Sequence, residues 1–177
     1  CAAALMTGGA AAGEHRTTQP RGMFTYLGTC DASAAVGVDA DRFLMADDES
    51  NILRLYRLGR REPLQAFDLN NHLGPELAWP EADSEAACRV GSRVYWITSH
   101  GRNSSGELRR SRYRFFATDL EVLPYRVNLY GAGRAYGSLV HDLIRAPQLT
   151  QYNFRELQHR APKWADALNI EGLAGAP

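Results

Sequence analysis

Short apolar runs alternate with polar turn residues along most of the chain from residue 34 onward. Four such runs occupy residues 34–39, 42–47, 52–58 and 64–69, and the segments between them are rich in Asp, Ser, Asn, Gly and Pro. Runs of this length, bounded by turn residues, are typical of strands in an antiparallel meander. In the third run, Arg54 and Arg57 interrupt the apolar positions, which predicts a strand with one face in water.

The same succession of runs returns at residues 85–90, 93–99, 112–120 and about 125–130. The segments 31–36, 83–88 and 169–174 share an opening in which polar residues precede small ones. A repeat of about fifty residues built from four strands is typical of the blades of a β-propeller. We therefore predict a mainly β fold, an incomplete β-propeller of antiparallel four-stranded blades with a helical insertion. Blade 1 is expected at about 28–70, blade 2 at about 81–131 and the start of blade 3 at about 167–177.

The segment between blade 2 and the start of blade 3 has a helical pattern. Ser138 is a candidate N-cap of a short helix that ends before Pro147, and a second helix is expected over 150–158. We assign the helical insertion to about 135–166. Because a closed propeller needs about 4 to 8 blades, we expect the chain to be part of a longer protein. Its exposed sheet edges would then pair with the missing blades or with another chain.

Residues 1–20 differ in composition from the rest of the chain. The sequence opens on Cys1 and continues with a stretch rich in Ala and Gly. One interpretation is a lipoprotein whose Cys1 carries lipid, and another is the end of a secretory signal with residues 10–12 as the cleavage site. A plain linker is the alternative. We predict an exported protein, periplasmic or extracellular, with anchoring through Cys1 as one form of export.

Composition and charge argue against several classes of function. Lys and Arg together number 20, as do Asp and Glu, so the formal net charge is zero. No whole-molecule field therefore favours a nucleic-acid partner or an anionic membrane, and no apolar run reaches the ~18 to 20 residues that span a bilayer. The three cysteines lack C-x-x-C spacing, which argues against a thiolate zinc site. We expect Cys30 and Cys88 to be small buried thiols, with a bridge between them as the alternative.

In four segments the chain resembles a bacterial family catalogued as domain of unknown function 3616: TCDASAAV, RFLMADDESNILRLY, SHGRN and APKWADALNIEGLA. The resemblance covers most of residues 28–177 and implies a propeller, often exported, without an established activity. The element NIEGLA is also similar to one in a propeller family labelled "esterase-like activity of phytase". Where the first family reads D-I-E-G, residues 83–86 read D-S-E-A, and Ser33 stands in place of the acid in the first unit. An acidic ring would therefore be incomplete at the first blade.

The first candidate site is the set of polar residues that opens each repeat unit: Asp31, Asp83, Glu85, Asn169 and Glu171. If the blades share one axis, these residues converge at the mouth of the central channel. Carboxylate and amide oxygens suit Ca²⁺ or Mg²⁺, so Asp83, Glu85, Asn169 and Glu171 are candidate ligands of Ca²⁺. The alternative is that these side chains hydrogen-bond neighbouring blades.

The acidic turn at Asp47, Asp48 and Glu49 is the second candidate, as part of a ligand-binding site. Three consecutive acids repel one another unless a cation or an arginine neutralises them. The spacing does not match an EF-hand loop. A solvated turn at the end of a strand is the alternative.

The third candidate is the loop that carries His100, Arg102 and Asn103. His100 and Arg102 could bind a phosphate or a carboxylate, with Arg102 supplying a bidentate fork. The alternative is that this loop pairs with the acidic turn of the neighbouring blade. Ser99 and His100 are adjacent on a strand and point to opposite faces, so they are poorly placed to be nucleophile and base to each other.

A basic stripe is the fourth feature. Arg110, Arg112 and Arg114 have the spacing of one strand face. Such a stripe could hold a polyanion, and a solvated face balanced by neighbouring acids is the alternative.

Three functions stay open from the sequence. The first is an exported propeller domain that binds a small or polyanionic ligand at the channel mouth, together with a divalent cation such as Ca²⁺. The second is a metal-assisted phosphoesterase or esterase, in which a cation held by the acids activates water. The third is a scaffold that binds another protein through a propeller face.

Overall fold

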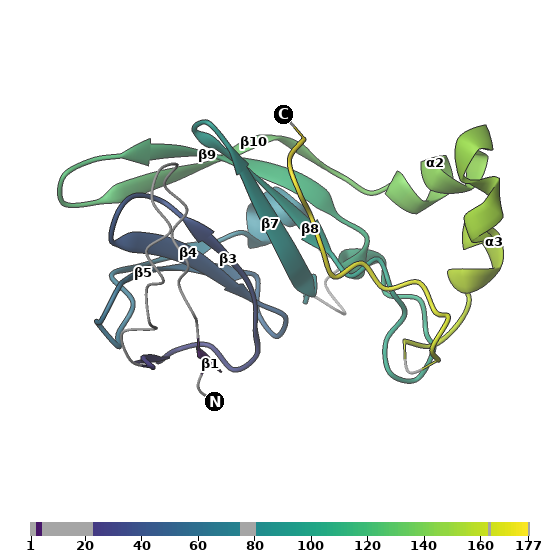
Figure 1. Ribbon diagram of the computed structural model, residues 1–177, viewed down its shortest axis with the longest axis horizontal. Coiled ribbons are helices and arrows are strands. Elements are labelled where there is room, and N and C mark those ends of the chain that lie inside the picture. Colours follow the sequence, from purple (N-terminus) through teal and green to yellow (C-terminus); the bar gives the residue numbers. More distant parts are fainter. Residues whose placement is uncertain (1–2, 5–22, 75–80, 163, 177) are drawn as a thin grey trace, which may run out of the picture.

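The computed structural model describes residues 3–4, 23–74, 81–162 and 164–176. Over these residues the fold is mainly β, with two four-stranded antiparallel sheets and few helices (Figure 1). This confirms the mainly β class and the two four-stranded units expected from the sequence. A short ladder joins β1 (Ala3–Ala4) to β2 (Thr25–Tyr26). The predictions about Cys1 and the cleavage site at residues 10–12 lie outside the described residues.

The first sheet is a meander in which each strand pairs with its neighbour in the chain, in the order β3-β4-β5-β6. Its strands are β3 (Ala32–Gly37), β4 (Arg42–Asp47), β5 (Ile52–Arg57) and β6 (Gln65–Asp68). Every residue of β4 is buried, because both of its faces are covered. On one face Phe43 and Met45 pack with Tyr56. On the other, Leu44 and Ala46 belong to the core shared with the second sheet.

The second sheet repeats this topology in the order β10-β9-β8-β7. Its strands are β7 (Ser84–Val90), β8 (Arg93–Thr98), β9 (Phe115–Val122) and β10 (Val127–Tyr136). Trp96 on β8 is fully buried and its ring stacks on Phe116 of β9, with ring centroids 6.4 Å apart. The indole N–H donates to Thr118 Oγ1 at 2.9 Å, so the one polar group of this large side chain is satisfied inside the core.

The two sheets pack with equivalent strands facing each other. The first strands, β3 and β7, lie side by side (Figure 1), and one apolar core contains residues from both sheets. At the far edge, Gln65 of β6 binds the backbone of Val127 on β10: its amide N–H donates to the carbonyl at 3.0 Å and its Oε1 accepts from the N–H at 2.8 Å. First strand therefore meets first strand, and last strand meets last strand.

Asn51 connects the first sheet to the segment that begins the second. Its side chain is buried, its Oδ1 accepts the N–H of Ala82 at 2.9 Å, and its Nδ2 donates to Oδ1 of Asn70 at 2.8 Å. Ala82 is itself fully buried, so its N–H depends on a protein acceptor. One amide group thus fixes where the chain enters the second sheet.

Replacing Asn51 by leucine is expected to lower the free energy of unfolding by about 2 kcal/mol, because the buried N–H of Ala82 loses this acceptor. Urea unfolding followed by circular dichroism measures the change. Asn128→Leu is the matched control: Asn128 bonds the exposed Glu121, so the change there should stay within about 0.5 kcal/mol. Equal losses in the two variants would contradict the assignment.

The helices differ in part from the predicted ones. α2 (Leu139–Arg145) lies where the first helix was expected, but the side chain of Ser138 makes no capping hydrogen bond. The second predicted helix is divided into the 3-10 helix η2 (Pro147–Tyr152) and α3 (Phe154–Leu157). The break falls at Asn153, whose φ of 51° is left-handed, a conformation that asparagine adopts more readily than most residues. α1 (Asn70–Leu73), between the sheets, was not expected.

Two further expectations can be compared with the structure. Cys30 is exposed and Cys88 is half-buried, and no disulfide joins them, so the expectation of a buried thiol is wrong for Cys30. None of the helices in the described residues is long and apolar enough to cross a membrane.

Candidate functional site

The same backbone arrangement occurs at the start of both sheets. In each, the first strand has an irregularity one residue in, at Ser33 between β3 and β4 and at Glu85 between β7 and β8. In each, an amide after the second strand donates to the carbonyl of the aspartate before the first: Asp48 N–H to Asp31 at 3.2 Å, and Ser99 N–H to Asp83 at 2.9 Å. Residues 31, 33, 48 and 49 are therefore the structural equivalents of residues 83, 85, 99 and 100.

In the first sheet this arrangement brings three carboxylates together. One oxygen from each of Asp31, Asp48 and Glu49 lies within 4.8 Å of the others. Asp48 Oδ1 is buried and has no hydrogen-bond partner in the described part of the chain. A Ca²⁺ ion bound at 2.3–2.6 Å can span oxygens up to about 5 Å apart. The spacing of the three side chains therefore fits one cation.

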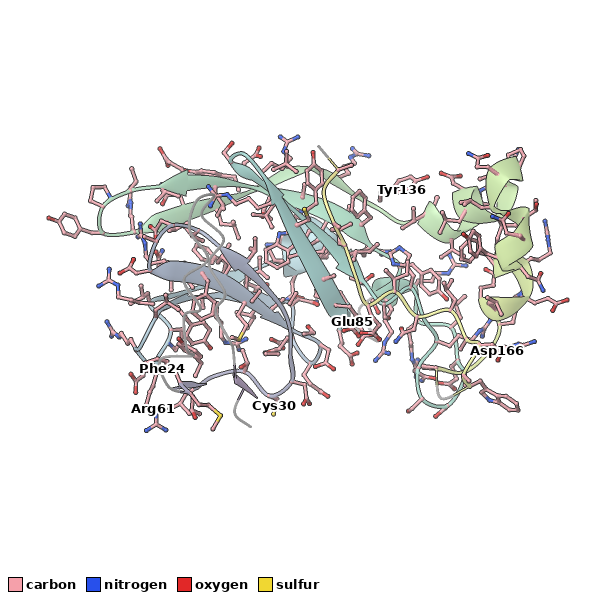
Figure 2. The ribbon with its side chains drawn as sticks, viewed as in Figure 1. Phe24, Cys30, Arg61, Glu85, Tyr136 and Asp166 are labelled. Atoms are coloured by element: carbon pink, nitrogen blue, oxygen red, sulfur yellow. The ribbon has the colours of Figure 1, made fainter. Side chains whose placement is uncertain are left out.

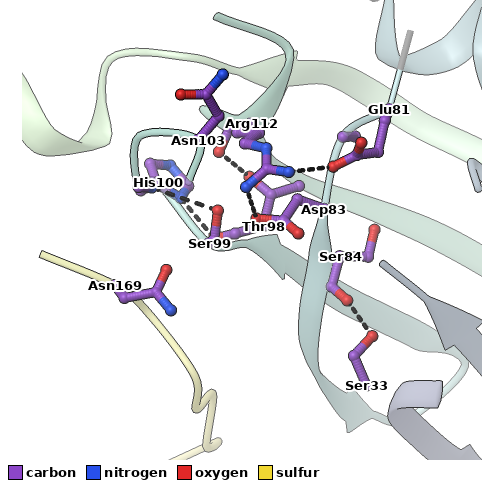
Figure 3. Close-up of polar contacts among 12 residues, drawn as sticks. Ser33, Glu81, Asp83, Ser84, Thr98, Ser99, His100, Asn103, Arg112 and Asn169 are labelled. Carbon is purple, nitrogen blue, oxygen red and sulfur yellow. Dashed lines mark hydrogen bonds and ion pairs between the residues drawn. The ribbon is translucent and has the colours of Figure 1, made fainter. Parts of the chain in front are cut away.

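The second sheet neutralises its equivalent carboxylate with an arginine. Asp83 is buried, and its Oδ2 lies 3.0 Å from an Nη of Arg112, which also pairs with Glu81 (Figure 3). The backbone there is left-handed at Asp83, with φ of 60°. This pairing could not be predicted from local sequence patterns, because Arg112 follows β8 and reaches back to the segment before β7. No described residue supplies a comparable cation to Asp31, Asp48 and Glu49.

The pKa of Asp48 is raised to about 6. Burial is the largest cause; a bond from its own backbone N–H opposes the shift, and the charges of Asp31, Asp83 and Glu49 add to it. Near pH 7 a carboxyl group with such a pKa is mostly ionised, and its negative charge is unfavourable in free energy because the group is partly buried among other acids. A bound cation would remove that cost.

Glu85 belongs to the same electrostatic field (labelled in Figure 2). Its pKa is raised to about 7, first by burial and then by the charges of Asp83, Glu171 and Asp48, while Arg112 acts in the opposite direction. Glu85 is thus close enough to acids of both sheets for their charges to raise its pKa. The first and second candidate sites of the sequence form one acidic cluster: Asp31, Asp48, Glu49, Asp83, Glu85 and Glu171.

The C-terminal segment reaches this cluster from the other side of β7. The N–H of Ile170 donates to the carbonyl of Ser99 at 2.7 Å, and Asn169 Nδ2 bonds Glu171. A Cβ atom on Gly101 would lie 2.9 Å from Asn169 Oδ1 and 3.3 Å from the carbonyl oxygen of Leu168, so a larger residue there would have to displace the Asn169 side chain. Asn169, on the C-terminal segment (Figure 3), therefore supports Glu171 and lies beside Gly101.

Asp47 points away from the cluster, although it is the first acid of the predicted turn. It is buried, its Oδ2 accepts from Arg54 at 2.9 Å, and its Oδ1 accepts from Ser50 at 2.7 Å. Asp47 thus has an arginine partner of the kind expected for the acidic turn. Asp48 and Glu49 alone face Asp31.

The loop after β8 gives its predicted anion-binding residues other partners. His100 is fully buried, and burial lowers its pKa, with its Nδ1 2.8 Å from the carbonyl of Thr98. Arg102 donates to the carbonyls of Gln158 and Gly106, at 3.0 Å each. Asn103 shapes its own turn through Glu107. The anion site at this loop stays a prediction, and these contacts do not add to it.

The predicted stripe of arginines is not one strand face. Residues 110–112 form the 3-10 helix η1 (Arg110–Arg112), and β9 begins only at Phe115. Arg112 turns toward Asp83, whereas Arg114 donates to the carbonyls of Leu73 and Arg110. The prediction of a basic stripe is wrong, because Arg112 and Arg114 bind different segments of the chain.

In comparisons with known proteins, no family model, no curated protein and no solved structure matches this chain.

Proposed function

We propose that the two sheets are successive blades of a β-propeller. The side-by-side first strands and the bond from Gln65 to the last strand of the second sheet support this. The C-terminal segment lies on the far side of β7, where Gly175 is close enough that a Cβ on it would be 3.1 Å from Cys88 Sγ. That is the position of the first strand of a third blade. We also propose that the chain is related to the family it resembles in sequence, domain of unknown function 3616, and that the protein is exported.

We further propose that the acidic cluster binds Ca²⁺ through Asp31, Asp48 and Glu49. The observation that carries the proposal is the buried Asp48 Oδ1, which has no described partner and lies among carboxylates that no described arginine neutralises. Ca²⁺ takes six to eight oxygen ligands, so three carboxylates leave positions for water or for an oxygen of a ligand. Such a ligand would be anionic or polar and would reach the ion at the mouth of the channel.

The expected affinity is that of an extracellular calcium module, with a Kd of about 10⁻⁴ to 10⁻³ M. Isothermal titration calorimetry of the chelator-treated chain with CaCl₂ measures it. Asp31→Asn and Asp48→Asn should each weaken binding at least about tenfold, because each removes a charged ligand. At 10 mM Ca²⁺ the parent should also gain about 1.4 to 2.7 kcal/mol of stability.

Asp41→Asn is the matched control. Asp41 lies in the turn between β3 and β4, and its one salt bridge among the described residues is with the exposed Arg57, at 3.1 Å. Its affinity for Ca²⁺ should equal that of the parent. Absence of both binding heat and thermal stabilisation would refute the cation site, as would full affinity in the Asp31 variant.

A further inference from the structure

A second site lies apart from the acidic cluster, between the helices and the second sheet. It is a pocket of about 590 Å³ lined by residues of α2, by Arg155 of α3, by Gln158 and by Tyr113, which precedes β9. Helices α2 and α3 stand to one side of both sheets (Figure 1). The volume falls within the 300–1,000 Å³ typical of small-molecule sites.

The interior of the pocket is partly apolar. Val140 is buried and Ile144 is half-buried, and both belong to α2, one helical turn apart, so they face the same side. The ring of Tyr113 packs edge-on against His100, with centroids 5.6 Å apart, which fixes its position. An apolar group of a ligand would therefore meet a preformed surface.

The charged side chains at the pocket all carry one sign. Arg145 and Arg155 line it, and no Asp or Glu does. Neither arginine forms an ion pair or a side-chain hydrogen bond with any residue that the structure describes. The nearby acids have hydrogen-bond partners of their own, Asp142 with Tyr136 and His141, and Glu156 with Asn153. The charge of Arg145 also acts on Asp142 and helps to lower its pKa, but the two side chains form no ion pair. Two guanidinium groups are thus available to an anion.

Tyr113 adds a neutral donor. Its hydroxyl makes no hydrogen bond to the described residues, and burial raises its pKa, so it keeps its proton at neutral pH. A phenolic O–H in a pocket that two arginines also line can donate to an oxygen atom of an anion.

We propose that this pocket binds a phosphate monoester with a small apolar body. The dianionic phosphate matches the two charges of Arg145 and Arg155, and the apolar body lies against Val140 and Ile144. This site shares no residue with the proposed calcium site and does not depend on it.

The test uses phenyl phosphate as the probe and calorimetry on the whole chain, with a chelator present to exclude metal effects. Phenyl phosphate should bind at least about tenfold more tightly than inorganic phosphate, because burying the ring adds apolar contact. It should also bind more tightly than benzoate, which has one charge. Arg145→Gln and Arg155→Gln should each weaken phenyl phosphate at least about tenfold.

Two further variants separate the parts of the site. Ile144→Ala should weaken phenyl phosphate and leave inorganic phosphate unchanged. Arg134→Gln, at an exposed arginine of β10 outside the pocket, should change neither. Equal affinity for phenyl phosphate and inorganic phosphate, equal affinity for benzoate, or unchanged binding in both pocket-arginine variants would each overturn the proposal.

Discussion

Replacing Trp96 by alanine is expected to lower the free energy of unfolding by about 3 to 5 kcal/mol, the range for removing a buried aromatic ring. Trp96 has no exposed surface and lies in the core that both sheets share. Its removal takes away the stacked contact with Phe116 and leaves Thr118 Oγ1 without the indole donor. Because a domain of this size is stable by only about 5–15 kcal/mol, the variant should be close to unfolding at 37 °C.

Urea unfolding monitored by far-ultraviolet circular dichroism measures this loss. Trp164→Ala is the matched control, because the Trp164 side chain is 66% exposed and its removal should cost no more than about 0.5 kcal/mol. Trp96→Phe, which keeps much of the ring, should recover part of the stability. A Trp96→Ala variant as stable as the Trp164 control would contradict a core shared between the sheets.

The acidic cluster predicts an unusual dependence of stability on pH when no cation is present. The folded pKa values of Asp48 and Glu85, about 6 and about 7, lie above their ordinary values of 3.8 and 4.5. Groups with a raised folded pKa contribute stability that is complete below the unfolded pKa and is lost as pH rises through the folded pKa. Their contribution should therefore fall between about pH 4 and pH 8.

The double variant Asp48→Asn/Glu85→Gln removes this loss. In chelator at pH 8 it should be more stable than the parent by about 3 kcal/mol, after discounting for partial exposure, and near pH 4 the two should be equal. The buried His100 has a lowered pKa and an opposite pH dependence, but it is present in both proteins and cancels in the difference. Thermal and urea unfolding at both pH values measure this.

Glu62→Gln, at an exposed acid in the connection between β5 and β6, is the control and should behave as the parent at both pH values. A stability difference between the double variant and the parent that is the same at pH 4 and pH 8 would show that the two carboxyl groups do not titrate as described.

The strands were the most predictable part of this molecule. Apolar runs bounded by turn residues located six of the eight sheet strands closely, because strand length and turn chemistry are local properties. The exceptions were β9, which begins at Phe115 instead of residue 112, and β10, which continues to Tyr136 instead of ending at about residue 130. The pattern of Arg112 and Arg114 looks like a strand, but Arg112 turns back to Asp83. A long-range ion pair overrode the local pattern.

The sequence pattern predicted which residues belong to the candidate site. It did not predict which of them lie close together in the fold. Asp31 and the turn at Asp48 and Glu49 entered as separate features, although the pairing of Ala32 with Asp47 places them together. The irregularity at Ser33 changes which residues face each other, and a register of this kind is set by pairing between strands. The pocket beside α2 was not predictable at all, since it depends on how a short helix lies against Tyr113.

The pairing of each strand with its chain neighbour has a consequence for how the protein is made. All the ladder hydrogen bonds of the first sheet join residues between 32 and 68, so the sheet can form before the second has left the ribosome. Local pairings of this kind carry a small loop-closure cost and fold early. If the first sheet forms first, Asn51 is already placed to accept the N–H of Ala82 when that segment emerges.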